Sequence, residues 1–451
     1  MKVIFCLRDF LPTHTGGTEV YVSALCTSLQ ALGVETIICK PGFGAGDRSE
    51  YFFDGIRILE YPESVHTDKA LITGQVKPGG LKAFGELVLD EKPDIVHFHE
   101  ISGANGITMA HMELVQQLGI PVFSTLHLPG YVCKTGHLKF KNKKPCDGII
   151  DIYKCSVCVL HERRLPSILP EAFASIGMFT RNNQWLINWM PGRMSGVLSY
   201  PEYLTRHKAQ LHDIFSISKK VFVLSKWFKK ILVSNNLPEN KMNLLEKAVP
   251  YQMADKFIKQ RKIYKGDEVL RFVYIGRISK VKGLDIVLKA FSRLSNKNWE
   301  LDIYGNVGDK DYGIACREAS DGISGVIQWR GIINSKNVVS TLASYDALLF
   351  PTIIQEMVGL VVMEAFAAGI PVIGSTVNGI SEQVINGENG ILFEPGNVRE
   401  LSKILEDLLN DPSLLNSLKE NIAMPGTFDK IGVETYQQYH KSVLEKQGSR
   451  L

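Results

Sequence analysis

The segment LRFVYIGRISKVKGLDIVLKAFSRLS, residues 270–295, contains the unit that decides the fold. It begins with a mostly apolar run that is typical of a buried strand, followed by a turn with glycine and basic residues. Apolar residues then recur at helical spacing from Leu284. Strand and helix patterns continue to alternate as far as Gly396. Buried strands that alternate with amphipathic helices predict a parallel sheet covered by helices on both faces.

A similar α/β series precedes this one and predicts a second sheet. Its strand-like runs are KVIFCL, VETIICK, PDIVHFHE, IPVFSTLH and KKVFVLS. The predicted organisation is a Rossmann-like domain over residues 1–248 with a Cys-rich insertion over about 129–206, a second such domain over 249–425, and a terminal helix over 426–451 that packs back on the first domain. Two parallel sheets facing a central cleft would place ligands at the carboxyl ends of their strands.

The composition is that of a globular protein. Of 451 residues, 45% are hydrophobic and 22% are charged, and the formal net charge is +4. Such a small charge gives no reason to expect a nucleic-acid partner. No apolar run approaches the roughly 18 residues of a membrane span. We therefore expect a cytoplasmic protein whose eight cysteines mostly remain reduced.

Two strand-to-helix turns are candidates for phosphate binding. Gly16 and Gly17 follow the first predicted strand, where glycine lets backbone N–H groups approach an anion closely. In the second domain, Arg277 and Lys282 follow the strand that ends near Gly276. Arginine offers a planar fork and lysine a mobile point charge, and this pair suits a diphosphate.

Glu356 and Glu364 frame the predicted helix within QEMVGLVVMEAFAAGIP. Eight residues along a helix correspond to a rise of roughly 12 Å, so the two carboxylates are not an acid–base pair across one bond. Glu356 is better placed in the loop before the helix, with Glu364 inside it. The helix N-terminus would then direct free N–H groups at an anion, and each glutamate would contact a different part of one elongated ligand.

These residues lie in motifs that resemble those of the retaining glycosyltransferases of family 4, which have the GT-B fold. The resemblance covers roughly Phe272 to Gly396 and rests on GRISKVKG and on EMVGLVVMEAFAAGIPVIGSTVNGISEQVINGENGILFEPG, with the Glu-x7-Glu pattern. In the N-terminal half it is looser and rests on GGTE, DIVHFHE, STLH and VFVLSKWFKK.

The resemblance implies roles for the matching positions. Arg277 and Lys282 would neutralise the diphosphate of a nucleotide-sugar, and Glu364 would bind the ribose. Glu356 would contact the donor sugar, and His127 would lie beside it. The remaining donor-binding positions are Gly16, Gly17, Gly276, Gly305, Val358, Gly359, Leu360 and Val361.

The implied activity is transfer of a sugar from a UDP- or GDP-sugar to an acceptor hydroxyl with retention of configuration. The acceptor would be a glycan or a lipid-linked glycan, as in bacterial polysaccharide or glycolipid biosynthesis. Two cations and a helix N-terminus can stabilise the departing diphosphate, so we expect no catalytic metal. The alternatives are a GT-B sugar-nucleotide epimerase, a phosphorylase, or a non-catalytic carbohydrate- or nucleotide-binding protein.

Half of the cysteines fall within the insertion: Cys133, Cys146, Cys155 and Cys158. Four thiolates can hold zinc tetrahedrally, and we favour a structural zinc site. An iron–sulfur cluster would use the same ligands, and free thiols are the remaining alternative.

Two further features are weaker candidates for a functional role. The first is a pair of basic segments, SKKVFVLSKWFKKIL and KFKNKK, of which the former contains Trp227 and Phe228. These segments could contact a membrane surface peripherally, or they could be a solvated helix flank, and both interpretations are open. His97 and His99 lie on one predicted strand, and we expect only one of them to face the ligand.

Overall fold

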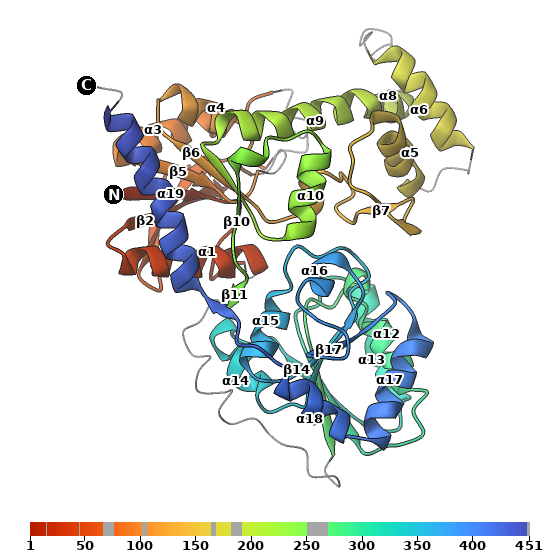
Figure 1. Cartoon of the computed structure of the whole chain (residues 1–451). Coiled ribbons are helices and arrows are strands. Elements are labelled where there is room, and N and C mark those ends of the chain that lie inside the picture. Colours follow the sequence, from red (N-terminus) through yellow and green to blue (C-terminus); the bar gives the residue numbers. More distant parts are fainter. Residues whose placement is uncertain are drawn as a thin grey trace. The chain divides into compact units, whose positions relative to one another are not determined.

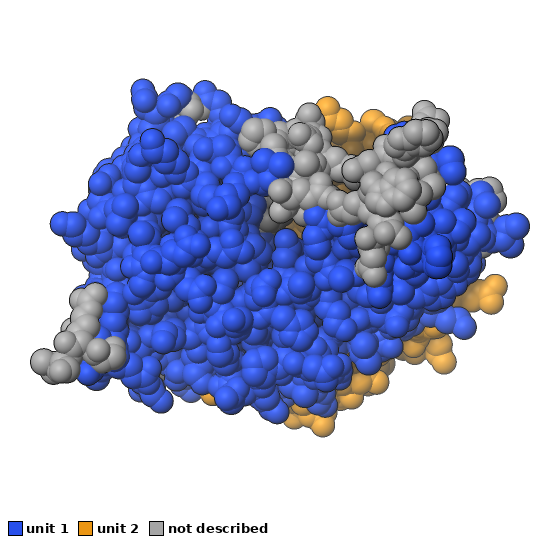
Figure 2. Space-filling model, turned by 90° about the horizontal axis from the view of Figure 1, so that it is seen from above, with its two compact units in different colours: residues 1–245, 429–451 blue, residues 246–428 orange. Residues whose placement is uncertain are grey.

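The computed structural model describes the chain except residues 15, 45, 66–75, 102–105, 164–167, 182–191, 250–268 and 449–451. The chain divides into two compact units (Figure 2). Unit 1 comprises Met1–Leu245 and Asp429–Leu451, and unit 2 comprises Glu246–Phe428. Each unit is built on its own sheet (Figure 1). The predicted α/β fold with two parallel-sheet domains is confirmed.

Unit 1 contains an eight-stranded sheet in the order β10-β9-β6-β5-β1-β2-β4-β3. Only β3 is antiparallel to its neighbour. The strands are β1 (Lys2–Cys6), β2 (Glu35–Phe43), β3 (Ser49–Phe53), β4 (Ile56–Glu63), β5 (Ile95–Phe98), β6 (Val122–Leu126), β9 (Lys220–Val223) and β10 (Met242–Leu244). β5 and β6 are buried throughout because continuous apolar strands need cover on both faces.

The helices of unit 1 connect these strands, and several belong to the insertion. They are α1 (Gly17–Ala31), α3 (Leu81–Glu91), α4 (Met109–Gln117), α5 (Ile152–Glu162), α6 (Leu169–Thr180), α8 (Gly192–Leu198), α9 (Tyr200–Ile217), α10 (Lys226–Ser234) and the short η1 (Pro129–Tyr131) and η2 (Glu239–Lys241). The insertion also contains a small antiparallel hairpin of β7 (Lys139–Phe140) and β8 (Lys144–Pro145).

Unit 2 contains a fully parallel six-stranded sheet in the order β14-β13-β12-β15-β16-β17. The strands are β12 (Leu270–Ile275), β13 (Trp299–Tyr304), β14 (Val326–Gly331), β15 (Ala347–Phe350), β16 (Val372–Ser375) and β17 (Gly390–Phe393). The chain moves outward from β12 in one direction and then returns to start again at β15. This reversal between neighbouring strands creates a crevice at their carboxyl ends.

Helices cover both faces of the unit 2 sheet, and two core clusters lie beneath them. The helices are η3 (Lys280–Lys282), α12 (Leu284–Phe291), α13 (Lys310–Asp321), η4 (Ser335–Asn337), α14 (Val338–Leu342), α15 (Leu360–Ala367), α16 (Asn378–Ser381), α17 (Val398–Asn410) and α18 (Ser413–Glu420). A short ladder pairs β11 (Ala248–Val249) with β18 (Gly426–Thr427).

The C-terminal helix α19 (Phe428–Gly448) runs along unit 1 past α1 (Figure 1). A Cβ atom at Gly432 would lie 2.1 Å from Oγ of Ser28, so the two helices approach closely. Tyr439 is fully buried, and its hydroxyl lies 2.5 Å from Nδ1 of His97. The last segment of the chain is therefore part of the core of unit 1.

Trp227 and Phe228 are buried in unit 1, with exposed fractions of 8% and 0%. Helix α10 turns these aromatic rings inward and leaves Lys226 and Lys230 exposed. The membrane interpretation was based on these aromatics and loses that basis, because rings in the core cannot enter a bilayer. None of the helices that the structure describes combines the length and apolar character needed to span a membrane.

Candidate functional site

Two loops of unit 2 meet where its strand order reverses. One follows β12 and carries Lys282, and the other follows β15 and carries Glu356. Nζ of Lys282 lies 2.5 Å from Oε1 of Glu356, and Oγ1 of Thr352 donates to the same oxygen over 2.9 Å. The lysine and glutamate side chains are 22% and 15% exposed. The pair is held in place and yet remains accessible, at the sheet position where open α/β folds bind ligands.

A close approach of the two loops fixes the backbone around this lysine. Gly283 ends η3 with a φ of +72°, and a Cβ atom there would lie 2.2 Å from the carbonyl oxygen of Pro351. The backbone N–H of Ile353 donates to the carbonyl of Val281 over 3.0 Å. A larger residue at Gly283 would push the loops apart, so glycine is required for the ion pair to form.

Arg277 is the second residue after β12 and is exposed. Its Cδ lies 2.7 Å from the position that a Cβ atom would take at Gly308, so the side chain runs across this glycine. Among the residues that the structure describes, no carboxylate forms an ion pair with Arg277. Its guanidinium group is therefore available to an anionic ligand.

Gly276 and Gly305 lie where the ends of β12 and β13 touch. A Cβ atom at Gly305 would lie 1.9 Å from the carbonyl oxygen of Gly276, and Gly305 has a φ of +155°. The N–H of Gly276 donates to the carbonyl of Tyr304 over 3.1 Å. Both glycines keep the carboxyl ends of these strands close together and free of side chains.

Helix α15 begins beside the Glu356 loop. No side chain caps its N-terminus, and Gly359 occupies the N-cap position in an extended conformation. Leu360 and Val361 form the first turn and are half-buried, as is Val358, and both valines pack against the core of unit 2. Free N–H groups and the helix dipole favour an anion at this end of the helix.

Glu364 lies in the same helix and is only 6% exposed. Burial raises the pKa of Glu364 to about 8. Within the described part of the chain, its carboxyl group has no hydrogen-bond partner. A buried carboxyl group without a partner is costly, and a ligand hydroxyl group would satisfy it.

In unit 1, Gly16 and Gly17 mark the start of α1, after β1. Gly16 is the N-cap, and no side chain bonds to this helix end. Glu19, in the first turn, is buried, and its Oε2 lies 2.6 Å from the position of a Cβ atom at Gly16. Burial raises the pKa of Glu19. Sequence reasoning did not select this glutamate, although it is part of the quoted GGTE motif.

His127 follows β6 and is buried. Its Nε2 lies 2.9 Å from Nδ1 of His99, and the ring of Tyr21 packs edge-on against it with centroids 5.0 Å apart. Burial lowers the pKa of His127 to about 3. The imidazole is therefore neutral near pH 7.

The expectation that only one of His97 and His99 faces the ligand stays a prediction, but the two rings do not lie on opposite faces of their strand. Their ring centroids lie 4.0 Å apart, because residues two positions apart on a strand project from the same face. His97 bonds to Oγ1 of Thr125 over 2.8 Å. Nε2 of His99 is buried without a hydrogen-bond partner. His99 is thus the neighbour of His127 that sequence reasoning failed to identify.

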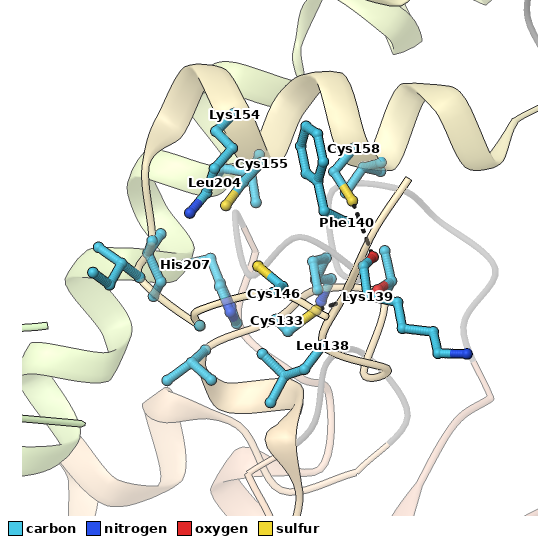
Figure 3. Close-up of a pocket in the computed structure, with 17 residues that line it drawn as sticks. Cys133, Leu138, Lys139, Phe140, Cys146, Lys154, Cys155, Cys158, Leu204 and His207 are labelled. Carbon is cyan, nitrogen blue, oxygen red and sulfur yellow. Dashed lines mark hydrogen bonds between the residues drawn. The ribbon is translucent and has the colours of Figure 1, made fainter. Parts of the chain in front are cut away.

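The four cysteines of the insertion line a single cavity of unit 1 (Figure 3). Among the described residues, however, no three His, Cys, Asp or Glu side chains are grouped closely enough to form a ready metal site. The other cysteines, Cys6, Cys26, Cys39 and Cys316, are buried elsewhere.

Comparison with known protein families identifies both halves of the chain. Residues 255–423 match the family described as Glycosyl transferases group 1, and residues 15–145 match Glycosyltransferase Family 4. The D-inositol 3-phosphate glycosyltransferase of Arthrobacter sp. (strain FB24) is 22% identical over 457 residues, which cover 95% of this chain and 90% of that relative. The capsular polysaccharide biosynthesis glycosyltransferase CapM of Staphylococcus aureus is 26% identical, over 46% of this chain and 55% of that protein.

Solved structures show the same fold over the whole chain. Sucrose-phosphate synthase from Thermosynechococcus elongatus has a TM-score of 0.64 at 15% identity and covers 98% of this chain and 99% of its own. Anabaena Alr3699/HepE, in complex with UDP and glucose, has a TM-score of 0.59 at 14% identity and covers 98% of this chain and 100% of its own. The solved structures show that the chain has the GT-B fold, and each half of its sequence is similar to a glycosyltransferase family. Within that class, the findings support a protein similar to glycosyltransferase family 4.

Proposed function

We propose that the protein transfers a sugar from a nucleoside-diphosphate sugar to an acceptor hydroxyl group with retention of anomeric configuration. The observation that carries this proposal is the grouping around the β12 and β15 strand ends in unit 2. An accessible lysine–glutamate pair, an arginine without an ion-pair partner and an uncapped helix N-terminus belong to adjoining loops there. These are the groups that a sugar diphosphate requires.

The diphosphate is the part of the donor that the cations and the helix recognise. Lys282 and Arg277 neutralise its oxygens, and the first N–H groups of α15 donate to it. As the bond between the sugar and the diphosphate breaks, negative charge grows on the leaving oxygen. These groups are fixed before the reaction, so they stabilise that charge without reorganisation.

The two glutamates bind the other parts of the donor. Glu364 has a buried carboxyl group without a partner, which suits the ribose hydroxyl groups. Glu356 is released from Lys282 when the lysine binds the diphosphate, and it then accepts hydrogen bonds from sugar hydroxyl groups. We assign His127 to the transferred sugar as well, where its neutral imidazole can donate or accept without repelling a developing positive charge at the anomeric carbon.

The proposal requires no catalytic metal, because the two cations supply the positive charge that a divalent ion would otherwise contribute. The triplet Asp309-Lys310-Asp311 matches the Asp-x-Asp pattern that can indicate a metal site. Asp309 instead caps α13 by accepting from the backbone N–H of Tyr312 over 3.1 Å. This aspartate is therefore accounted for by helix capping.

A donor panel tests the proposed function. Wild-type protein is incubated with UDP-, GDP- or ADP-sugars and with glycan or lipid-linked glycan acceptors, and nucleoside diphosphate release is followed. We expect release with one donor class only in the presence of an acceptor, and NMR of the product should show the anomeric configuration of the donor. Acceptor-independent interconversion of the donor would instead indicate an epimerase, and binding without turnover would indicate a non-catalytic protein.

A further inference from the structure

The segment that follows His127 in unit 1 has little apolar burial to hold it together. It consists of η1, the two short strands β7 and β8, and the connection to α5. Between residues 131 and 149, only Val132, Leu138 and Gly148 are buried. Small elements that bury so little surface are usually stabilised by a disulfide or a metal ion. All eight cysteines of the chain are free, so no disulfide performs this function.

Four thiols reach one cavity from three elements of this segment. Cys133 comes shortly after η1, Cys146 follows β8 directly, and Cys155 and Cys158 lie one turn apart on α5. Figure 3 shows Cys155 and Cys158 on the cavity side of the helix, and Sγ of Cys158 donates to the carbonyl of Lys139 over 3.6 Å. The cavity has a volume of about 20 Å³, which is room for one water molecule or one metal ion.

A backbone N–H group is already directed at one of these sulfur atoms. The N–H of Lys141 donates to Sγ of Cys158 over 3.2 Å. A donor of this kind is typical of the surroundings of metal-bound cysteine.

The charges of the cavity wall also suit a cluster of thiolates. Lys134, Lys139 and Lys154 line the same cavity, and Lys154 is paired with Asp147 over 2.7 Å. Four thiolates around a divalent ion carry a net charge of −2, which the ammonium groups of Lys134 and Lys139 would offset. Nε2 of His207, in the same wall, is buried without a hydrogen-bond partner.

We propose that Cys133, Cys146, Cys155 and Cys158 bind one zinc ion. On binding, each thiol releases its proton and its sulfur becomes a ligand at roughly 2.3 Å in tetrahedral geometry. Among the described residues the sulfur atoms are not gathered at these distances, so the four cysteines would have to move together on binding. The ion would crosslink η1, the hairpin and α5, and so hold the segment that begins directly after His127. This inference does not depend on the proposed sugar transfer.

Metal analysis of the full-length protein tests the site. The protein is purified without chelator and without a metal-affinity step, and its metals are measured by mass spectrometry. We expect about one zinc ion per chain, and Cys158→Ser should lose most of it. Cys316→Ser removes a buried thiol outside the cavity and should keep the zinc. Replacement of zinc by cobalt should produce the intense visible bands of tetrahedral cobalt thiolate.

The wild-type measurement decides the question even if the variants fail to fold. Zinc below about one-tenth of an equivalent per chain, in protein expressed with ample zinc, would overturn the proposal. Iron in place of zinc, or a disulfide among the four cysteines in freshly purified protein, would also overturn it.

Discussion

Nζ of Lys282 and Oε1 of Glu356 lie 2.5 Å apart, although 74 positions separate the two residues in the sequence. The two loops that carry them follow β12 and β15, the neighbouring strands between which the order of the sheet reverses. The side chains are 22% and 15% exposed, so the ion pair is mostly buried and yet still reached by water. We propose that its place at the strand ends serves ligand binding.

Glu356→Gln should test the functional role of this carboxylate. The amide retains the size of the side chain and an oxygen for Thr352, but it loses the charge. We expect sugar transfer to fall by about 10²-fold or more, because a group that contacts the reacting sugar is lost. The free energy of unfolding should fall by about 1–3 kcal/mol, because the charged hydrogen bond to Lys282 is weakened.

The matched control is Glu388→Gln, which alters an exposed glutamate of the same unit. It should leave the rate of sugar transfer and the free energy of unfolding unchanged. Transfer by Glu356→Gln at the wild-type rate would contradict the role of this carboxylate.

Glu364 should make stability depend on pH. Its pKa is raised by burial from 4.5 to about 8, so the folded state holds a proton that the unfolded state has lost above pH 4.5. The wild type should lose stability as pH rises from 4.5 to about 8, at up to about 1.4 kcal/mol per pH unit. Glu364→Gln cannot titrate, so its stability relative to the wild type should increase over this window. Chemical denaturation at several pH values, without nucleotide, measures the difference; parallel curves would show that the carboxyl group is ionised when folded.

His127 should make the stability of the protein fall as the pH decreases, which is the opposite of the effect of Glu364. Burial lowers its pKa from 6.5 to about 3, so the unfolded state binds a proton below pH 6.5 that the folded state rejects. Stability should fall as pH decreases from 6.5 toward 3, and it should fall less steeply in His127→Asn. Acid unfolding followed by circular dichroism tests this.

Gly305→Ala should damage the phosphate-binding region specifically. The new Cβ atom would lie 1.9 Å from the carbonyl oxygen of Gly276, so the ends of β12 and β13 must separate. Gly331 also has a positive φ, +76°, but a Cβ atom there meets nothing within 4 Å. Gly331→Ala should therefore show only the cost of backbone strain, about 1–2 kcal/mol. Nucleoside diphosphate affinity should decrease in Gly305→Ala far more than in Gly331→Ala, and equal affinities would contradict the placement of the site.

The main features of the unit 2 site could be predicted from local sequence patterns. The strand pattern before Gly276 and the helix pattern after Gly359 placed Arg277 and Glu356 in loops at strand ends, where the structure has them. The contact between Lys282 and Glu356 could not be predicted, because it depends on β12 and β15 being neighbours. Strand order is a tertiary property, and the spacing of residues in the sequence does not encode it.

Sequence patterns were least informative where one local pattern permits two environments. An aromatic pair flanked by lysines suits a membrane surface as well as an amphipathic helix, and packing against the sheet of unit 1 placed Trp227 and Phe228 inside. The contact of His99 with His127 could have been anticipated, since strand residues two positions apart share a face and β5 and β6 were both predicted strands. The contact of Tyr439 with His97 could not have been anticipated, because 342 positions separate these two residues in the sequence.

Calorimetric binding of nucleoside diphosphates tests the central claim most directly. Wild type, Lys282→Ala and Lys280→Ala are titrated with UDP, GDP and ADP; Lys280 lies on the same short helix and is exposed, so it is a matched control. We predict that one nucleotide binds the wild type and Lys280→Ala equally, and that Lys282→Ala binds it at least about tenfold more weakly, as loss of a charged contact to a diphosphate requires. If none of the three nucleotides binds the wild type, or if Lys282→Ala binds as tightly as Lys280→Ala, the nucleotide-sugar site is not where we place it.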